Sequence, residues 1–144
     1  MKGIKMSDCK FYVNEEERIV VCVIPKTKYM VEDFIKDHFK WNDIDMQFAV
    51  DMDLLKKLYL PSSFMGKAVC AEGDEWNEEL GRMIAFSRAK DKCYKSFFRH
   101  ANILVQAFDR RLGDMIEMFN DFGLKLEEKK ETLTNMIEER IQKD

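Results

Sequence analysis

The chain has 144 residues, with 24 Lys and Arg against 27 Asp and Glu, so its formal net charge is −3. This length favours one domain over residues 1–144, and 46% hydrophobic with 35% charged residues is a globular and not a disordered composition. The sequence has no apolar run near the roughly 20 residues that span a bilayer and no signal-peptide pattern, so we expect a cytoplasmic protein that does not bind a membrane. It also has no excess of positive charge, so we expect no binding to a nucleic-acid polymer.

The first half of the chain, residues 10–73, predicts a small antiparallel sheet with short helices. Residues 10–13 and the β-branched run 18–24 flank a polar turn at 14–17, which is typical of a hairpin that ends at Pro25. Residues 64–71 predict a third strand, and we expect it to pair with the hairpin, because two strands alone are marginally stable in water. Apolar spacing predicts short helices at 31–39 and 51–59.

The second half predicts one long helix over residues 74–121, with Asp74 as its N-cap. Its apolar stripe advances by alternating threes and fours, an average of about 3.6 residues per step, which is the helical period. Gly113 lies inside this helix at a cost of about 1 kcal/mol. The stripe consists of Trp76, Leu80, Met83, Ser87, Lys90, Tyr94, Phe97, Ala101, Val105, Phe108, Leu112, Met115 and Phe119, with Ser87 and Lys90 as its polar members.

Gly123 resembles the glycine that follows a helix end. A shorter antiparallel return helix then carries Leu126, Leu133, Met136, Ile137 and Ile141. The predicted fold class is therefore α+β, with a small N-terminal antiparallel sheet (10–73) followed by a long C-terminal helical hairpin (74–143).

A second apolar face lies roughly opposite the first on the long helix. A chain of this size can hardly cover both faces, so we expect a homo-oligomer in which a two-fold contact buries the second face. The alternative is that residues 31–60 wrap around and cover it. This face consists of Phe86, Ala89, Cys93, Ile103, Leu104 and Ala107.

Residues 82–111 carry eight Lys and Arg but only two acids. Arg88, Lys92, Lys95 and Arg99 form one ridge, interleaved with aromatic residues, and this pattern suits either a solvated face or a nucleotide site. Arg82 and Arg111 project toward the second apolar face, where each needs either a carboxylate or a ligand phosphate.

Catalytic and metal chemistry find little support. The sequence lacks the phosphate-loop, nucleophile-elbow, HExxH and dinucleotide-binding motifs, and it has only two histidines. The four cysteines form no CxxC pair and are expected to be free structural thiols. The acids at positions 43, 45, 51 and 53 are loosely spaced and lack the glycine and the terminal glutamate of a calcium loop. We expect no cofactor, no metal and no enzymatic activity.

Two segments carry a resemblance to a known family. Residues 66–70 read GKAVC, Asp74 follows, and residues 81–89 read GRMIAFSRA, a pattern common in small phage proteins. Together with the hairpin at 10–24, residues 64–90 resemble the Thoeris anti-defence sponges of phages. The resemblance implies a non-enzymatic oligomer, a dimer or a hexamer built from dimers, in the bacterial cytosol. It also implies sequestration of a cyclic ADP-ribose isomer or a cyclic oligonucleotide.

The leading hypothesis is therefore a phage protein that binds a cyclic nucleotide immune signal without degrading it. The alternatives are a phage inhibitor that contacts a host defence enzyme directly and, third, a small enzyme. Acidic stretches at 43–53 and 72–79 suit the inhibitor. In the leading hypothesis Phe86 stacks on a base, Asn102 hydrogen-bonds base or ribose, Arg88, Arg110 and Arg111 hold phosphates, and Arg82 completes the ligand site.

Overall fold

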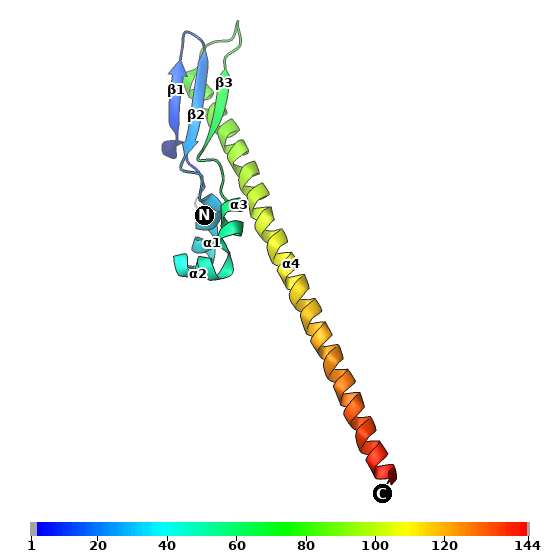
Figure 1. Ribbon diagram of the computed structural model, residues 1–144. Coiled ribbons are helices and arrows are strands. Elements are labelled where there is room, and N and C mark those ends of the chain that lie inside the picture. Colours follow the sequence, from blue (N-terminus) through cyan, green and yellow to red (C-terminus); the bar gives the residue numbers. More distant parts are fainter. Residues whose placement is uncertain (1–2, 144) are drawn as a thin grey trace. The chain divides into compact units, whose positions relative to one another are not determined.

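A computed structural model describes residues 3–143, which divide into two compact units, one that ends at Leu104 and one that begins at Val105. The first unit holds the sheet, three short helices and the start of α4, and the second consists of the rest of α4 (Figure 1). The α+β class is confirmed. The elements are the 3-10 turn Met6–Asp8, β1 Lys10–Asn14, β2 Ile19–Pro25, α1 Met30–Phe39, α2 Asp43–Ala49, α3 Met52–Lys57, β3 Ser63–Val69 and α4 Glu78–Lys143.

The three strands form an antiparallel sheet in the order β1-β2-β3. Tyr12 pairs with Val21, and Val21 pairs on its other side with Lys67, so β2 is the central strand. Arg18 closes the turn between β1 and β2 with a positive φ of 59°. The predicted hairpin and third strand are both confirmed.

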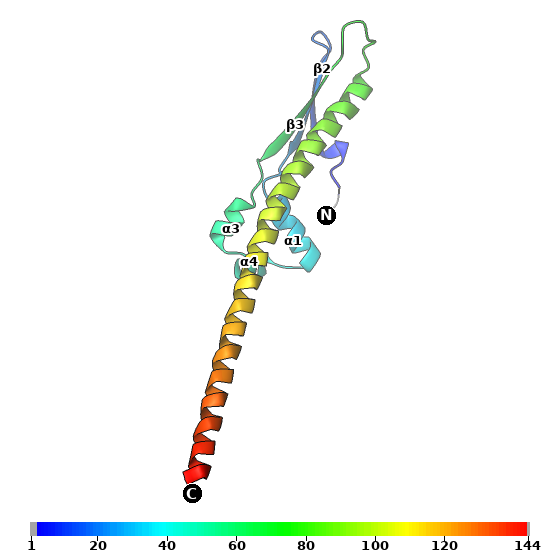
Figure 2. The same ribbon diagram turned by 90° about the vertical axis from the view of Figure 1, so that its right-hand side faces the viewer.

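The first turns of α4 cover one face of this sheet (Figure 2). Every second residue of β2 faces α4 and is buried, as the period of two in a strand requires. Small side chains on α4 let the helix come close. The shared core consists of Val20, Cys22, Ile24, Ala68, Ala85, Ala89 and Cys93.

The short helices form where their caps and apolar residues specify them. The expected helices at 31–39 and 51–59 are present as α1 and α3. Between them lies α2, which the sequence analysis missed: Asn42 accepts from the Asp45 amide while the Asp45 side chain accepts from the Asn42 amide. Two of the acids considered for calcium, Asp45 and Asp51, therefore act as helix caps.

The start of α4 differs from the prediction. The helix begins at Glu78, and the Asn77 side chain accepts a hydrogen bond from the Leu80 amide at 3.0 Å. Asp74 belongs to the preceding loop, where its carbonyl accepts from the Arg18 guanidinium. Asn77 is the N-cap because its oxygen reaches the third helical amide, which is the usual capping geometry.

The predicted return helix is wrong. α4 runs unbroken from Glu78 to Lys143, so Gly123 lies inside it and not after its end. The prediction of one unbroken helix over 74–121 is thus correct, but the predicted helix ends too early. A single helical glycine costs only about 1 kcal/mol, and the Glu- and Lys-rich sequence after it favours helix.

The predicted burial of the second helix face between protomers is also wrong, because Leu104 and Ala107 at its far end are already buried in the single chain. Ala89 and Cys93 are fully buried against the chain's own sheet, and Phe86 packs beside them. Helix α1 contacts the same face, because the Met30 sulfur lies 3.4 Å from the Cys93 sulfur. The covering segments are thus the sheet and α1, so the alternative cover by residues 31–60 is correct only in part.

Candidate functional site

The outer edge of β3 carries two cations from α4. The Arg88 guanidinium donates to the Lys67 carbonyl at 2.7 Å, and the Lys92 ammonium donates to the Met65 carbonyl at 3.0 Å. The two cations are four residues apart, so they lie one helical turn apart on the same ridge. Their anchoring on backbone places them side by side along the strand.

The ladder explains why these carbonyls are accessible. Cys70 donates its amide to the Arg18 carbonyl at 2.9 Å, so hydrogen-bonded pairs alternate from that point along β2 and β3. Met65 and Lys67 occupy the non-hydrogen-bonded positions of this alternation, so their backbone N–H and C=O groups point away from β2. The same edge therefore presents their amide donors next to the two cations.

Phe86 and Arg82 lie in packed surroundings. The Phe86 ring packs on the core, and the Lys90 ammonium sits 4.9 Å from its centroid. Arg82 lies over the Phe11 ring at 5.1 Å and pairs with Glu78 at 3.4 Å. Arg82 therefore pairs with a carboxylate, one of the two kinds of partner expected for it.

The remaining predicted residues lie further along α4. Asn102 is exposed in the first unit, some 20 residues and about 30 Å along the helix from Arg82. Arg110 and Arg111 are exposed in the second unit. Within the first unit, Asn102 therefore lies apart from Arg82, Phe86 and Arg88.

Sequence reasoning missed the role of Lys92. Its spacing from Arg88 was visible in the basic ridge, but the strand edge that both residues bind is brought to them only by the fold. Lys95 and Arg99 continue the ridge, and Lys95 is paired with Asp91 at 2.8 Å.

Two hollows in the first unit are unsuited to phosphate. One, of about 280 Å³, is lined by Trp76 and Cys70 together with Asp74 and Glu75. The other, of about 270 Å³, is lined by Asp8, Asp33 and Asp37 against one cation, Lys26, and burial raises the pKa of Asp33 above its usual range. An excess of acidic side chains disfavours an anion, so neither hollow suits a phosphate group.

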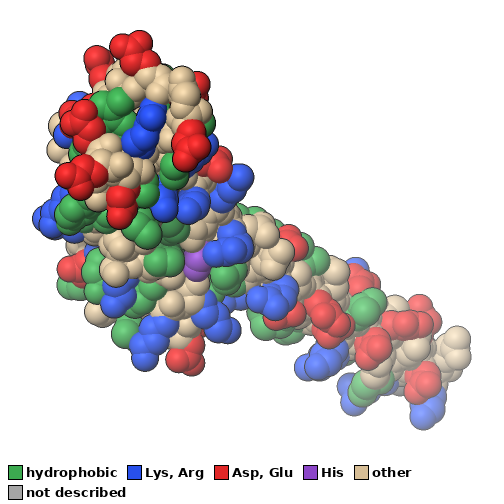
Figure 3. Space-filling model, turned by 90° about the horizontal axis from the view of Figure 1, so that it is seen from above, with side chains coloured by type: hydrophobic (Ala, Val, Ile, Leu, Met, Phe, Trp, Pro, Cys, Tyr) green, Lys and Arg blue, Asp and Glu red, His purple; other side chains and the backbone are tan. Residues whose placement is uncertain are grey.

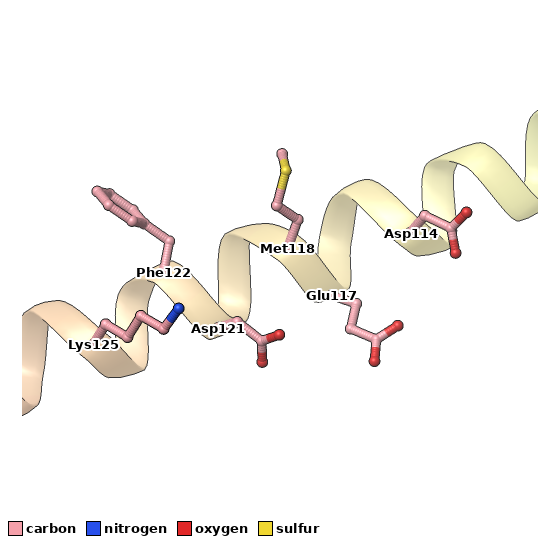
Figure 4. Close-up of a pocket in the computed structure, with 6 residues that line it drawn as sticks. All are labelled: Asp114, Glu117, Met118, Asp121, Phe122 and Lys125. Carbon is pink, nitrogen blue, oxygen red and sulfur yellow. The ribbon is translucent and has the colours of Figure 1, made fainter.

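A third hollow, on the second unit, is lined by one face of α4 alone. Met118 and Phe122 lie along one edge of this face, and Asp114, Glu117 and Asp121 lie along its other edge (Figure 4). Side chains from a single helix cannot enclose a small molecule, so this surface is amphipathic rather than a pocket.

Comparison of the chain with models of protein families, with curated proteins and with solved structures finds no match. Among residues 3–143, no group of three or more His, Cys, Asp or Glu side chains is placed to hold a metal ion. Every helix in that range is too short or too polar to cross a bilayer.

Proposed function

We propose that this protein binds a phosphate-bearing nucleotide at the β3 edge and sequesters it without chemical change. The observation that carries the proposal is the pair of cations, Arg88 and Lys92, held side by side on β3 carbonyls. The resemblance to the phage sponges extends the proposal to a cyclic nucleotide immune signal, bound during infection in the bacterial cytosol.

The donor count supports an anion at this edge. A guanidinium has five N–H donors and an ammonium has three, and Arg88 and Lys92 each use one of them to bind a β3 carbonyl. The remaining donors, with the amides of Met65 and Lys67, face the same solvent region. Because the two side chains are already ordered, a bound phosphate costs less side-chain entropy.

The proposal retains Arg88 and adds Lys92 to the residues predicted from sequence. Phe86 is left out as a stacking platform because Lys90 lies over its ring and the core packs beside it. Arg82 is left out because Phe11 and Glu78 engage it. Asn102 remains a predicted contact to base or ribose. Arg110 and Arg111 remain predicted contacts to phosphate.

Calorimetric titration with cyclic ADP-ribose isomers and cyclic dinucleotides tests the proposal. Arg88→Gln should weaken binding by about 2 kcal/mol, roughly 30-fold. Arg99→Gln is the matched control, since it removes the same charge from the same exposed helix outside the β3 edge. Equal losses in both variants would mean general charge attraction and would reject the edge site.

A second candidate is a protein inhibitor that presents acidic side chains to a basic surface. Because the strands are antiparallel, the β1–β2 turn and the loop after β3 lie at the same end of the sheet. Figure 3 looks onto this end and shows acidic side chains gathered there. The turn contains Glu15, Glu16 and Glu17, and the loop contains Glu72, Asp74 and Glu75.

One experiment separates the candidates. The purified protein is incubated with a mixed nucleotide extract, washed, and heated, and the released material is weighed by mass spectrometry. Intact nucleotide supports sequestration, a converted product supports an enzyme, and the absence of any nucleotide supports the protein inhibitor.

A further inference from the structure

An apolar stripe with a strict spacing of three and four residues runs along α4 in the second unit. Its members are largely exposed, Phe119 at 61% and Phe122 at 59%, because the second unit consists of this helix segment alone. The stripe averages 3.5 residues per step and is interrupted only by Lys129, which is the pattern of a coiled-coil seam. It consists of Val105, Phe108, Leu112, Met115, Phe119, Phe122, Leu126, Lys129, Leu133 and Met136.

We propose that residues 105–136 pair with the same segment of a second copy as an antiparallel two-helix coiled coil centred between Phe119 and Phe122. The contact is isologous, so it closes after two copies. It uses a different surface from the helix face first predicted for assembly, and it does not rest on nucleotide binding.

The apolar area is sufficient for a stable contact. A fully buried Phe removes about 150–250 Å² from water, so the three phenylalanines of each copy, at their present exposure, contribute roughly 600 Å² together. The Leu, Met and Val members are 50–62% exposed and add to this. The total passes the ~1,000 Å² expected of a specific interface.

Charge decides the direction of the second helix. In a parallel pair in register, Lys129 would face its own copy in the seam, and Lys125 would flank Lys130 of the second copy. Like charges at such positions destabilise the pair. A parallel arrangement is therefore disfavoured.

The antiparallel pair removes these conflicts. Phe119 then faces Phe122 of the second copy at the two-fold axis, and Leu112 faces Lys129, whose methylene stem covers it. On the flank, Asp109 lies opposite Lys130 of the second copy, and symmetry repeats this opposite-charge pair at the other end.

Gly123 supplies an independent observation. It lies inside a helix at a cost of about 1 kcal/mol, and a Cβ added there would meet nothing within 4 Å in its own chain. In the antiparallel register it lies beside the two-fold axis, opposite Ile116 of the second copy. The missing side chain leaves room for that isoleucine.

Light scattering tests the assembly. At about 50 μM we expect the wild type to have twice the 17.1 kDa chain mass. Phe119→Glu should give the single-chain mass, because it places an unpaired carboxylate at the axis. Leu124→Glu is the matched control: it makes the same charge change on an exposed face off the seam and should leave the mass doubled.

Cross-linking tests the direction. In Asp109→Cys/Lys130→Cys, the two thiols are about 30 Å apart along one helix, so a 109–130 disulfide can form only between copies. We expect that bond on mild oxidation, located by peptide mass spectrometry. A wild type of single-chain mass would overturn the proposal and assign the stripe to a different partner. Cross-linking of Lys125→Cys/Lys130→Cys in place of the 109–130 pair would overturn the antiparallel direction.

Discussion

Gly66 lies where the β3 backbone packs directly against the α4 backbone. A Cβ added there would come within 2.1 Å of the Ala85 carbonyl oxygen and 2.4 Å of the Ala89 amide nitrogen. Both are backbone atoms of a helix, so neither can move aside without displacing α4. The glycine sets the distance at which the Arg88 and Lys92 side chains reach the β3 edge.

We predict that Gly66→Ala lowers the free energy of unfolding by about 3 kcal/mol, at the upper end of overpacking costs. Urea unfolding followed by circular dichroism measures the change. Gly113→Ala is the control, since its Cβ would meet nothing and should stabilise the helix by about 1 kcal/mol. Tolerance of Gly66→Ala would mean that α4 sits further from the sheet.

From two buried thiols we predict how the free energy of unfolding depends on pH. Burial raises the pKa of Cys22 to about 12 and that of Cys93 to about 11, from an ordinary 9.0. Above pH 9 the thiols of the unfolded chain ionise while those of the folded protein stay protonated, so the unfolded state is stabilised relative to the folded state. Each thiol should therefore lower the free energy of unfolding by up to about 1.4 kcal/mol per pH unit between 9 and its folded pKa.

The measurement is a urea titration at pH 7.5, 9 and 10.5 on the wild type and on Cys93→Ala. The wild type should lose stability more steeply above pH 9 than the variant, because the variant lacks one of the two thiols. Identical slopes would show that Cys93 ionises alike in both states.

At the scale of elements, the start of α4 depends on one side chain. We predict that Asn77→Ala costs about 1 kcal/mol, because the Leu80 amide loses its acceptor. Asp74→Ala should cost less than about 0.5 kcal/mol, since Asp74 serves Arg18 through its backbone carbonyl, which the substitution keeps. Thermal melts by circular dichroism compare the two. A larger loss in Asp74→Ala would restore Asp74 as the cap.

At the scale of the molecule, the two units should unfold separately. Both tryptophans, Trp41 and Trp76, belong to the first unit, so their fluorescence reports on that unit alone. Circular dichroism reports on both. If the second unit is stabilised by pairing with another copy, its melting temperature rises with protein concentration, whereas a unit folded within one chain shows no such dependence.

We therefore predict that ellipticity shows a transition that moves upward between 2 and 200 μM, on the order of several degrees, and that tryptophan fluorescence shows one that stays fixed. Phe119→Glu should shift the ellipticity transition and leave the fluorescence transition unchanged. Coincident curves with one concentration dependence would indicate a single cooperative unit.

Local pattern was enough to predict the strands, two of the short helices and the continuity of the long one. Alternation in β2 and the three-and-four spacing on α4 are properties of each segment alone, and they arise wherever one face is buried. The basic ridge was visible for the same reason, and with it Arg88.

Tertiary structure decided what those patterns leave open. Periodicity indicates that a helix face is covered but not by which segment, because burial of apolar surface is not directional. The covering of Cys93 by the chain's own sheet and the binding of Lys92 to the β3 edge could therefore not be predicted. Gly123 is compatible with a helix end or a helix interior, since glycine adopts either conformation, and only the unbroken α4 assigns it to the interior.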